Sequence, residues 1–365
     1  MAIQLGAPPL LNDPVNLRLL EKLVSGEATS PNLSLLSKRF GKHRNTVKER
    51  VDELLDHKVL DRPVFPFIGL YREYPLLIAV RADIPNDEQF RRWISTDEHI
   101  FAAFRSRQGE YNTLLFLFHK DVTSYQLWRE SLVPQGKIPP REFRYPSSTS
   151  YFSTRMMVKY EPSSAIKLIE EDLRRNGELE INGCTIDRLS FDIMKALVLG
   201  EGIKVNENFL SKELGLHRRT ISKRIERLIE EGFVGRPVCR FPNFFVPPNY
   251  ILVFSLYEVR RSKEAILEEM KRDPHVPIAM NVSHGRYNLL LFGNHNSITD
   301  HLEWEERYEA KFSNCFGSAD ITYLSPKMTV SIDQQKVSLG IIRGKLRELE
   351  GGPQPERPLP PPDGA

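Results

Sequence analysis

The sequence predicts an α+β protein with two winged helix-turn-helix domains, each followed by a βαββαβ ferredoxin-like domain. Two observations lead to this prediction. Residues 210–229 read as two short amphipathic helices around a turn at Gly215. The same pattern occurs 174 positions earlier, where Leu36-Ser37-Lys38 matches Leu210-Ser211-Lys212 and Gly41 matches Gly215. A repeat of this quality indicates a duplicated chain.

Length and composition are those of a soluble multidomain protein. The 365 residues have 40% hydrophobic residues, 27% charged residues and a net charge of +3, so any basic binding surface must be local. The three cysteines, Cys184, Cys239 and Cys315, lie far apart, which argues against a zinc ribbon or a disulfide framework and fits a reducing cytoplasm. Since neither a membrane span nor a signal peptide is visible, we expect a cytoplasmic protein without a membrane partner.

The first winged helix is expected at residues 12–66. Asp13 can cap a helix that runs to Val24, with Pro14 in its first turn. Two further helices follow, and we expect the second helix of the unit to pack the third against the first. Residues 57–64 read as a short hairpin, the wing. These predicted helices are Pro31–Phe40 and His43–Leu55.

The first ferredoxin-like domain is expected at residues 67–160. Its apolar runs and amphipathic runs alternate as strand, helix, strand, strand, helix, strand, which predicts an antiparallel sheet with both helices on one face. In this order, the predicted elements are Tyr74–Ile84, Asn86–Asp97, Ile100–Gln108, Tyr111–His119, Thr123–Val133 and Tyr151–Tyr160.

The second half repeats this organisation. We expect a connector with a helix at residues 161–185, a second winged helix at 186–242 and a second ferredoxin-like domain at 243–335. Residues 336–365 form a C-terminal extension whose Pro-rich end is expected to be disordered. In the second βαββαβ pattern the repeat offset is 176, as in His119 and His295. The predicted elements are Asn249–Val259, Lys263–Arg272, Val276–His284, Tyr287–Gly293, Ile298–Phe312 and Ala319–Ile332.

The third helix of each winged unit has the features of a DNA-recognition helix. An apolar stripe forms one face, while basic and hydroxyl-bearing residues occupy the other. A solvated surface helix would be the plainer interpretation. The repetition at matching positions favours specific binding of double-stranded DNA. The predicted DNA-binding residues are His43, Arg44, Asn45, Thr46, Lys48, Arg50, Arg62, His217, Arg218, Arg219, Thr220, Ser222, Lys223, Arg224 and Arg236.

Within this set, different roles are expected. Arg50 and Arg224 lie one turn further along and should contact phosphate or pair with acids on their own helix. Arg62 and Arg236 are placed for wing contacts with the DNA backbone or minor groove. Residues 217–227 carry five basic residues and one acid, whereas residues 43–53 balance to zero. The second unit is therefore expected to be the stronger anchor, and the chain to prefer an asymmetric site.

A winged helix followed by a βαββαβ domain with a Gly-x-Tyr turn resembles the Lrp/AsnC (feast/famine) transcription regulators. The resemblance covers nearly the whole chain, twice. It implies a prokaryotic transcription regulator in which one chain mimics a dimer, with its βαββαβ domains paired within or between chains. It also implies a possible small-molecule effector site near the turn. These turn residues are Gly109, Tyr111, Asn112, Gly285, Tyr287 and Asn288.

Two departures from that family pattern stand out. His43 and His217 occupy the helix-cap position where Ser or Thr is usual. Asn112 and Asn288 replace the Asp of the turn, which removes a natural partner for an ammonium group and argues against amino-acid sensing.

Two other readings remain open. Siroheme decarboxylases resemble fused or paired Lrp-like units, and an enzyme of that kind would use histidines of this chain. A protein that serves only for assembly is the other alternative. Because no histidine has recognisable metal-ligand spacing, we expect no metal, no cofactor and no enzymatic activity. The histidines concerned are His99, His119, His275, His284, His295 and His301.

Overall fold

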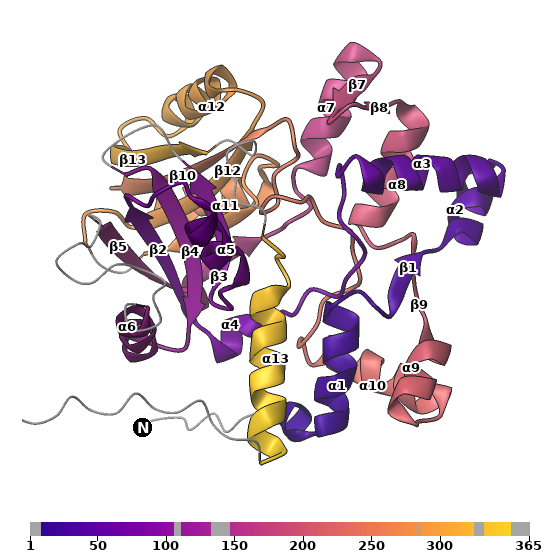
Figure 1. Ribbon diagram of the computed structural model, residues 1–365. Coiled ribbons are helices and arrows are strands. Elements are labelled where there is room, and N and C mark those ends of the chain that lie inside the picture. The colour runs from indigo at the N-terminus through magenta and orange to yellow at the C-terminus, as the bar shows by residue number, and fades with distance from the viewer. Residues whose placement is uncertain (1–8, 106–110, 133–146, 283–284, 325–331, 352–365) are drawn as a thin grey trace, which may run out of the picture.

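The computed structural model describes residues 9–105, 111–132, 147–282, 285–324 and 332–351 (Figure 1). It confirms the predicted α+β fold class, with helix-turn-helix units and two antiparallel sheets. The first unit begins with the short η1 (Pro9–Asn12). It continues through α1 (Pro14–Val24), β1 (Thr29–Pro31), α2 (Leu33–Phe40) and α3 (Arg44–Asp56). Asp13 caps α1 as expected, because its carboxylate accepts a hydrogen bond from the Val15 N–H at 2.8 Å.

The second unit repeats α1, β1, α2 and α3 at the predicted offset of 174. It consists of α8 (Arg188–Val198), β9 (Ile203–Val205), α9 (Glu207–Leu214) and α10 (Arg218–Glu230). Both turns between the last two helices use glycine in the left-handed region. The φ angles are +60° at Gly41 and +63° at Gly215, a conformation that side chains with a Cβ rarely adopt.

The two units exchange their first helices, an arrangement that the sequence pattern does not predict. Helix α3 packs against α8 of the second unit, while α1 lies beside α9 and α10 (Figure 1). Strands β1 and β9 pair antiparallel at the crossing point, with Thr29 opposite Val205. The expectation that each third helix packs on the first helix of its own unit is therefore wrong. The crossing strands carry each chain segment over to the other unit, so the two units form one body.

The expected hairpin wing is also wrong. Within the described residues, 57–64 contain no strand of their own. Instead, Val64 forms an isolated bridge with Val238, and Phe67 forms one with Val234. The backbone polar groups that a hairpin would satisfy locally are thus paired between the two units.

Two antiparallel sheets follow the ferredoxin-like order. The first has the strand order β3-β4-β2-β5 and the second β13-β10-β12-β11-β6. Helices α5 (Glu88–Thr96) and α6 (Val122–Ser131) accompany the first sheet, and α11 (Lys263–Arg272) and α12 (Ile298–Lys311) accompany the second. The strands are β2 (Leu76–Ala82), β3 (Ile100–Arg105), β4 (Thr113–His119), β5 (Ser147–Ser153), β6 (Met157–Tyr160), β10 (Ile251–Val259), β11 (Ile278–Asn281), β12 (Leu289–His295) and β13 (Phe316–Leu324).

One strand crosses from the first half into the second sheet. The stretch 151–160 was expected to be a single strand, but a 3-10 turn at Thr154–Met156 divides it. Strand β5 pairs with β2 of its own half, whereas β6 pairs with β11, placing Tyr160 opposite Ile278. The turn redirects the chain, so that β6 extends the edge of the second sheet.

The faces of the sheets that lack helices pack on each other within the chain. Phe116 of β4 lies at the centre, with ring centroids 5.3 Å from Phe254 and 5.1 Å from Phe292. Phe244, from the segment before β10, stacks on Phe116 at 6.0 Å. Burying both apolar faces against each other removes them from water, which is the pairing expected from their alternating apolar residues.

Helices outside the repeated units complete the body. The expected connector helix is α7 (Ile166–Asn176), followed by the short pair β7 (Leu179–Ile181) and β8 (Cys184–Ile186). The C-terminal extension contains α13 (Lys336–Leu349), which packs on α1, and a further short helix, α4, spans Leu70–Glu73. The Pro-rich end lies outside the described residues. In the parts of the chain that the structure describes, no helix is long and apolar enough to cross a bilayer.

Candidate nucleic-acid interface

The two predicted recognition helices, α3 and α10, both start with a histidine cap. The Nδ1 atom of His43 accepts a hydrogen bond from the Asn45 N–H at 3.3 Å, and that of His217 accepts from the Arg219 N–H at 3.2 Å. An Nδ1 that accepts a hydrogen bond carries no proton in the neutral ring, so the N–H must be on Nε2. Since both side chains are exposed, each helix N-terminus presents an N–H donor to solvent.

The predicted base-reading residues lie on the outer faces of α3 and α10. The apolar stripes are buried, with Val47 and Ile221 fully inside. Ser222 and Thr46 are half-buried at the border between the two faces. The exposed members of the predicted set on these two helices are Arg44, Asn45, Lys48, Arg218, Arg219, Thr220 and Lys223. The side chains that would meet a major groove are therefore accessible.

Arg50 and Arg224 do not belong to this outer face. Arg50 forms an ion pair with Glu53 of its own helix and another, at 3.0 Å, with Asp187 of the second unit. Arg224 bridges in the opposite direction, to Asp13 at 2.6 Å. Phosphate contact was one of the two predicted roles, and these pairs leave both guanidinium groups committed. They brace the exchanged helices instead.

The carboxylates that receive these arginines are also helix caps. Partial burial would raise the pKa of Asp13, but hydrogen bonds from Arg224 and from the Val15 N–H outweigh it and hold the pKa below its ordinary value. Burial again acts to raise the pKa of Asp187. Hydrogen bonds from Ser190 and the charge of Arg50 outweigh it and hold the pKa below its ordinary value. Both groups are thus ionised partners at neutral pH.

The remaining basic residues differ between the two helices. Lys48 pairs with Asp52 on α3, and Arg218 pairs with Glu207 on α9. By contrast, no carboxylate in the described part of the chain pairs with Arg219 or Lys223. Arg62 and Arg236 are exposed next to the bridges that link the two units. More uncompensated charge therefore lies on α10.

The two asparagines of the predicted effector turn form hydrogen bonds with the backbone of the chain itself. Asn288 accepts a hydrogen bond from the Val259 N–H and donates one to the Val259 carbonyl. Asn112 accepts from the Ile84 N–H at 2.9 Å. Both amides are thus used by the chain itself. Tyr111, Tyr287 and Gly285 lie beside them, whereas Gly109 is outside the described residues. An effector site at this turn remains a prediction.

The histidines named for the alternative activity form two groups. His99 and His119 stack at 4.2 Å in the first half, and burial together with the neighbouring His99 lowers the pKa of His119 to about 2. His275, His295 and His301 gather around the start of α12 in the second half. His284 lies outside the described residues. Each group lies beside a helix-covered sheet face, away from the recognition helices.

An apolar cavity lies between the two sheets and the segment that follows the first unit. Its walls include Tyr71, Phe118, Tyr160 and Phe245, and Arg240 is the one charged residue among its described lining residues. Sequence reasoning missed this cavity because its walls come from both halves of the chain.

Comparison with known proteins gives only fold-level likeness. No family model and no curated protein matches the chain. Among solved structures, the siroheme decarboxylase NirDL has a TM-score of 0.47 and 10% identity, covering 93% of this chain and 99% of that chain. Its co-complex with an iron-uroporphyrin III analogue has a TM-score of 0.45 and 10% identity, covering 87% of this chain and 94% of that chain. These values assign no activity to this chain.

Several transcription regulators match over about a third of the chain. AsnC from E. coli has a TM-score of 0.28 and 17% identity, covering 32% of this chain and 78% of that chain. An AsnC family regulator from Agrobacterium tumefaciens has a TM-score of 0.28 and 20% identity, covering 38% of this chain and 89% of that chain. The expectation that the chain is not an enzyme is contradicted, because the two structures that cover most of it are those of an enzyme. We withdraw that expectation.

Proposed function

We propose that the chain is a transcription regulator of the Lrp/AsnC type that binds double-stranded DNA sequence-specifically, as a single-chain counterpart of a dimer. The observation that carries this proposal is the accessible polar face at the same position of both recognition helices. Arg44 and Asn45 occupy it in α3, and Arg218 and Arg219 occupy it in α10. Arginine and asparagine are the side chains that pair with guanine and adenine edges in the major groove.

The histidine caps support the same orientation toward DNA. Their Nε2–H groups sit at helix N-termini, where the backbone dipole also favours an anion such as a phosphate. Contacts of this kind position a protein on the duplex without reading its sequence. The caps would thus fix the position of the protein on the duplex, and the base-reading residues would provide the specificity.

The two units present different residues to the bases. Asn45 in the first unit corresponds to Arg219 in the second, and Lys48 corresponds to Ser222. A symmetric homodimer reads a palindrome because its two reading surfaces are identical. This chain should therefore select a site with two unlike halves.

The test is selection of bound fragments from random double-stranded DNA by the purified full chain at physiological salt. We expect enrichment of one asymmetric sequence. The double variant R218A/R219A should then bind that sequence more weakly by about 1–3 kcal/mol for each lost base contact.

A matched control removes the same charge elsewhere. Arg272 and Arg307 are exposed on α11 and α12, away from the recognition helices, and R272A/R307A should keep wild-type affinity. Absence of any enriched sequence, or equal losses in both double variants, would refute the proposed interface.

A further inference from the structure

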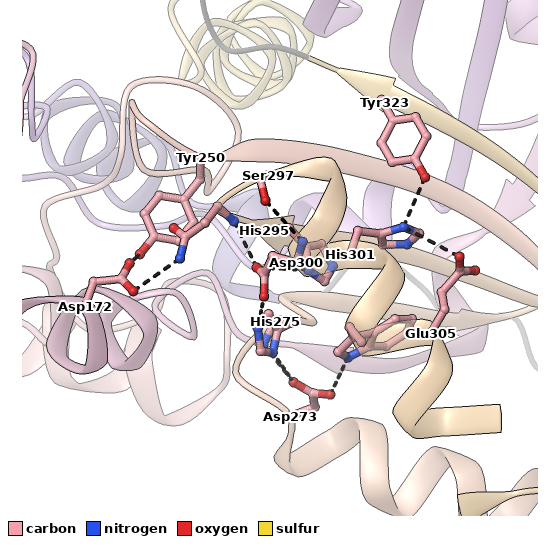
Figure 2. A network of polar contacts seen from close by, with 12 residues as sticks. Asp172, Tyr250, Asp273, His275, His295, Ser297, Asp300, His301, Glu305 and Tyr323 are labelled. Atoms are coloured by element: carbon pink, nitrogen blue, oxygen red, sulfur yellow. Dashed lines mark hydrogen bonds and ion pairs between the residues drawn. The ribbon is translucent and has the colours of Figure 1, made fainter. Parts of the chain in front are cut away.

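A cluster of nitrogen and oxygen donors lies at the start of α12, where β12 ends (Figure 2). His275 comes from the turn between α11 and β11, His295 is the last residue of β12, and Asp300 stands in the first turn of α12. One donor atom of each residue lies within 4.8 Å of the other two. Three separate elements thus bring one donor each to a common point.

The spacing of these groups is too wide for good hydrogen bonds. The Nε2 atom of His275 is 3.9 Å from Oδ1 of Asp300, and Nδ1 of His295 is 3.5 Å from Oδ2. Protein hydrogen bonds to nitrogen are about 2.7–3.2 Å long. Around a tetrahedral ion with bonds of about 2.0–2.1 Å, neighbouring donors lie roughly 3.3 Å apart. Small side-chain movements would therefore suit an ion better than they suit the present contacts.

His295 supplies an independent indication of a missing partner. Its side chain is 1% exposed, and its Nδ1 atom has no hydrogen-bond partner among the described residues. A buried polar atom without a partner costs about 1–3 kcal/mol. The atom faces Asp300, so a ligand placed between them would satisfy it.

His275 is held in the tautomer that a metal ligand requires. Its Nδ1 donates to Oδ1 of Asp273 at 2.9 Å, which leaves the lone pair on Nε2, the atom that faces Asp300. Asp273 is itself fixed, because its other oxygen accepts from Trp304 and Tyr308. A carboxylate behind a ligating histidine is the usual support of a metal centre.

The first half provides an internal comparison. At the offset of 176, Asp97, His99 and His119 match Asp273, His275 and His295, but Ser124 stands where Asp300 would be. There, Nδ1 of His99 donates to the Phe118 carbonyl at 3.2 Å. The first half therefore keeps the histidine pair, but it lacks the third ligand, and a carbonyl instead of a carboxylate holds the tautomer of His99.

We propose that His275, His295 and Asp300 bind one divalent transition-metal ion, Zn²⁺ in the first place, and that the first half binds none. Two imidazoles and a carboxylate suit this class of ion, and three protein ligands leave a further position for water. Two of the three ligands reach solvent, since the side chains of His275 and Asp300 are 14% and 28% exposed. The site is separate from the recognition helices.

The experiment uses the full chain after treatment with a chelator. Zn²⁺ is titrated by calorimetry, and Co²⁺ is added as a probe whose visible absorption reports coordination. We expect one equivalent of either ion to bind with a tetrahedral or five-coordinate Co²⁺ spectrum. D273N, which removes only the supporting carboxylate, should weaken binding roughly 10–100-fold. D300N should weaken it more.

The control is H119Q in the first half, which should bind like the wild type. Circular dichroism checks that each variant is folded, and D300N changes only one partly exposed group. Failure of the folded wild type to bind Zn²⁺ or Co²⁺ would overturn the proposal. So would equal affinity in the wild type and D300N, because the ion would then occupy other histidines of the chain.

Discussion

At the scale of single residues, two matched ion pairs join the units. Arg50 with Asp187 and Arg224 with Asp13 are equivalent contacts at the repeat offset of 174, and each carboxylate also caps a helix. The pairs are only partly buried, which limits the free energy that each contributes. Each pair connects α3 or α10 to the start of the first helix of the other unit, so the pairs favour the exchanged arrangement of these helices.

Removing one of these charges tests that role. Asparagine caps helices as well as aspartate does, so D13N keeps the cap and deletes only the ion pair with Arg224. We expect the free energy of unfolding, measured with urea, to fall by about 0.5–1 kcal/mol. In the double variant D13N/R224Q the two losses should not add. Additive losses would show that the pair does not couple the units.

Buried His119 makes a second prediction, on pH. Burial lowers its pKa to about 2, from an ordinary value of 6.5. Between these values the unfolded chain binds a proton that the folded chain does not, so stability falls as the pH falls below about 6.5. From pH 7 to pH 5 this residue alone should cost roughly 2 kcal/mol.

The variant H119F isolates this contribution. Phenylalanine keeps an aromatic ring beside Tyr125 and Trp128 but cannot take up a proton. Urea unfolding at both pH values should show a smaller loss of stability on acidification than in the wild type. If wild type and variant lose the same amount, the folded protein must accommodate a protonated His119.

At the scale of elements, the two recognition helices have the same shape and different charge. Lys48 of α3 is tied to Asp52, whereas Arg219 and Lys223 of α10 have no acidic partner in the described chain. Phosphate attraction sets the salt dependence of DNA binding, with about 0.9 in the slope for each neutralised phosphate. Helix α10 should therefore contribute more of that slope.

Two variants that each lose two charges compare the helices directly. R219A/K223A should lower the salt slope of affinity by up to about 2, and R44A/K48A should lower it less. The measurement is affinity for one selected sequence across a salt series. If R44A/K48A reduces affinity and slope more strongly, the first unit is the main anchor and the ranking is reversed.

At the scale of the whole molecule, the packed sheets hold the two halves together. Phe116 is fully buried between Phe244, Phe254 and Phe292. F116A should reduce the free energy of unfolding by about 3–5 kcal/mol, the usual cost of deleting a buried aromatic ring.

A surface truncation is the control for this prediction. Leu127 is 50% exposed on α6, and L127A should change stability by less than about 0.5 kcal/mol. A small effect of F116A, similar to that of L127A, would mean that the sheets do not rely on this contact.

The local features of the molecule were predictable from sequence. Helices α1, α2, α3 and their repeats begin and end close to the predicted residues, because caps and apolar stripes act over a few positions. The strand order within each ferredoxin-like half followed from the alternation of apolar patterns. The duplication itself was visible as a constant offset between matching residues.

What the sequence by itself determined is therefore the fold class, the repeated order of elements and the helices α3 and α10 with their exposed outer faces. The tertiary structure alone decided the exchange of α1 and α8, the crossing of β6 into the second sheet and the meeting of His275, His295 and Asp300. The physical reason is the distance along the chain over which each interaction acts. Caps, turns and stripes are set by neighbours along the chain, whereas a duplicated chain offers each helix two chemically similar partners. Only the path of the connecting strands in space selects between them.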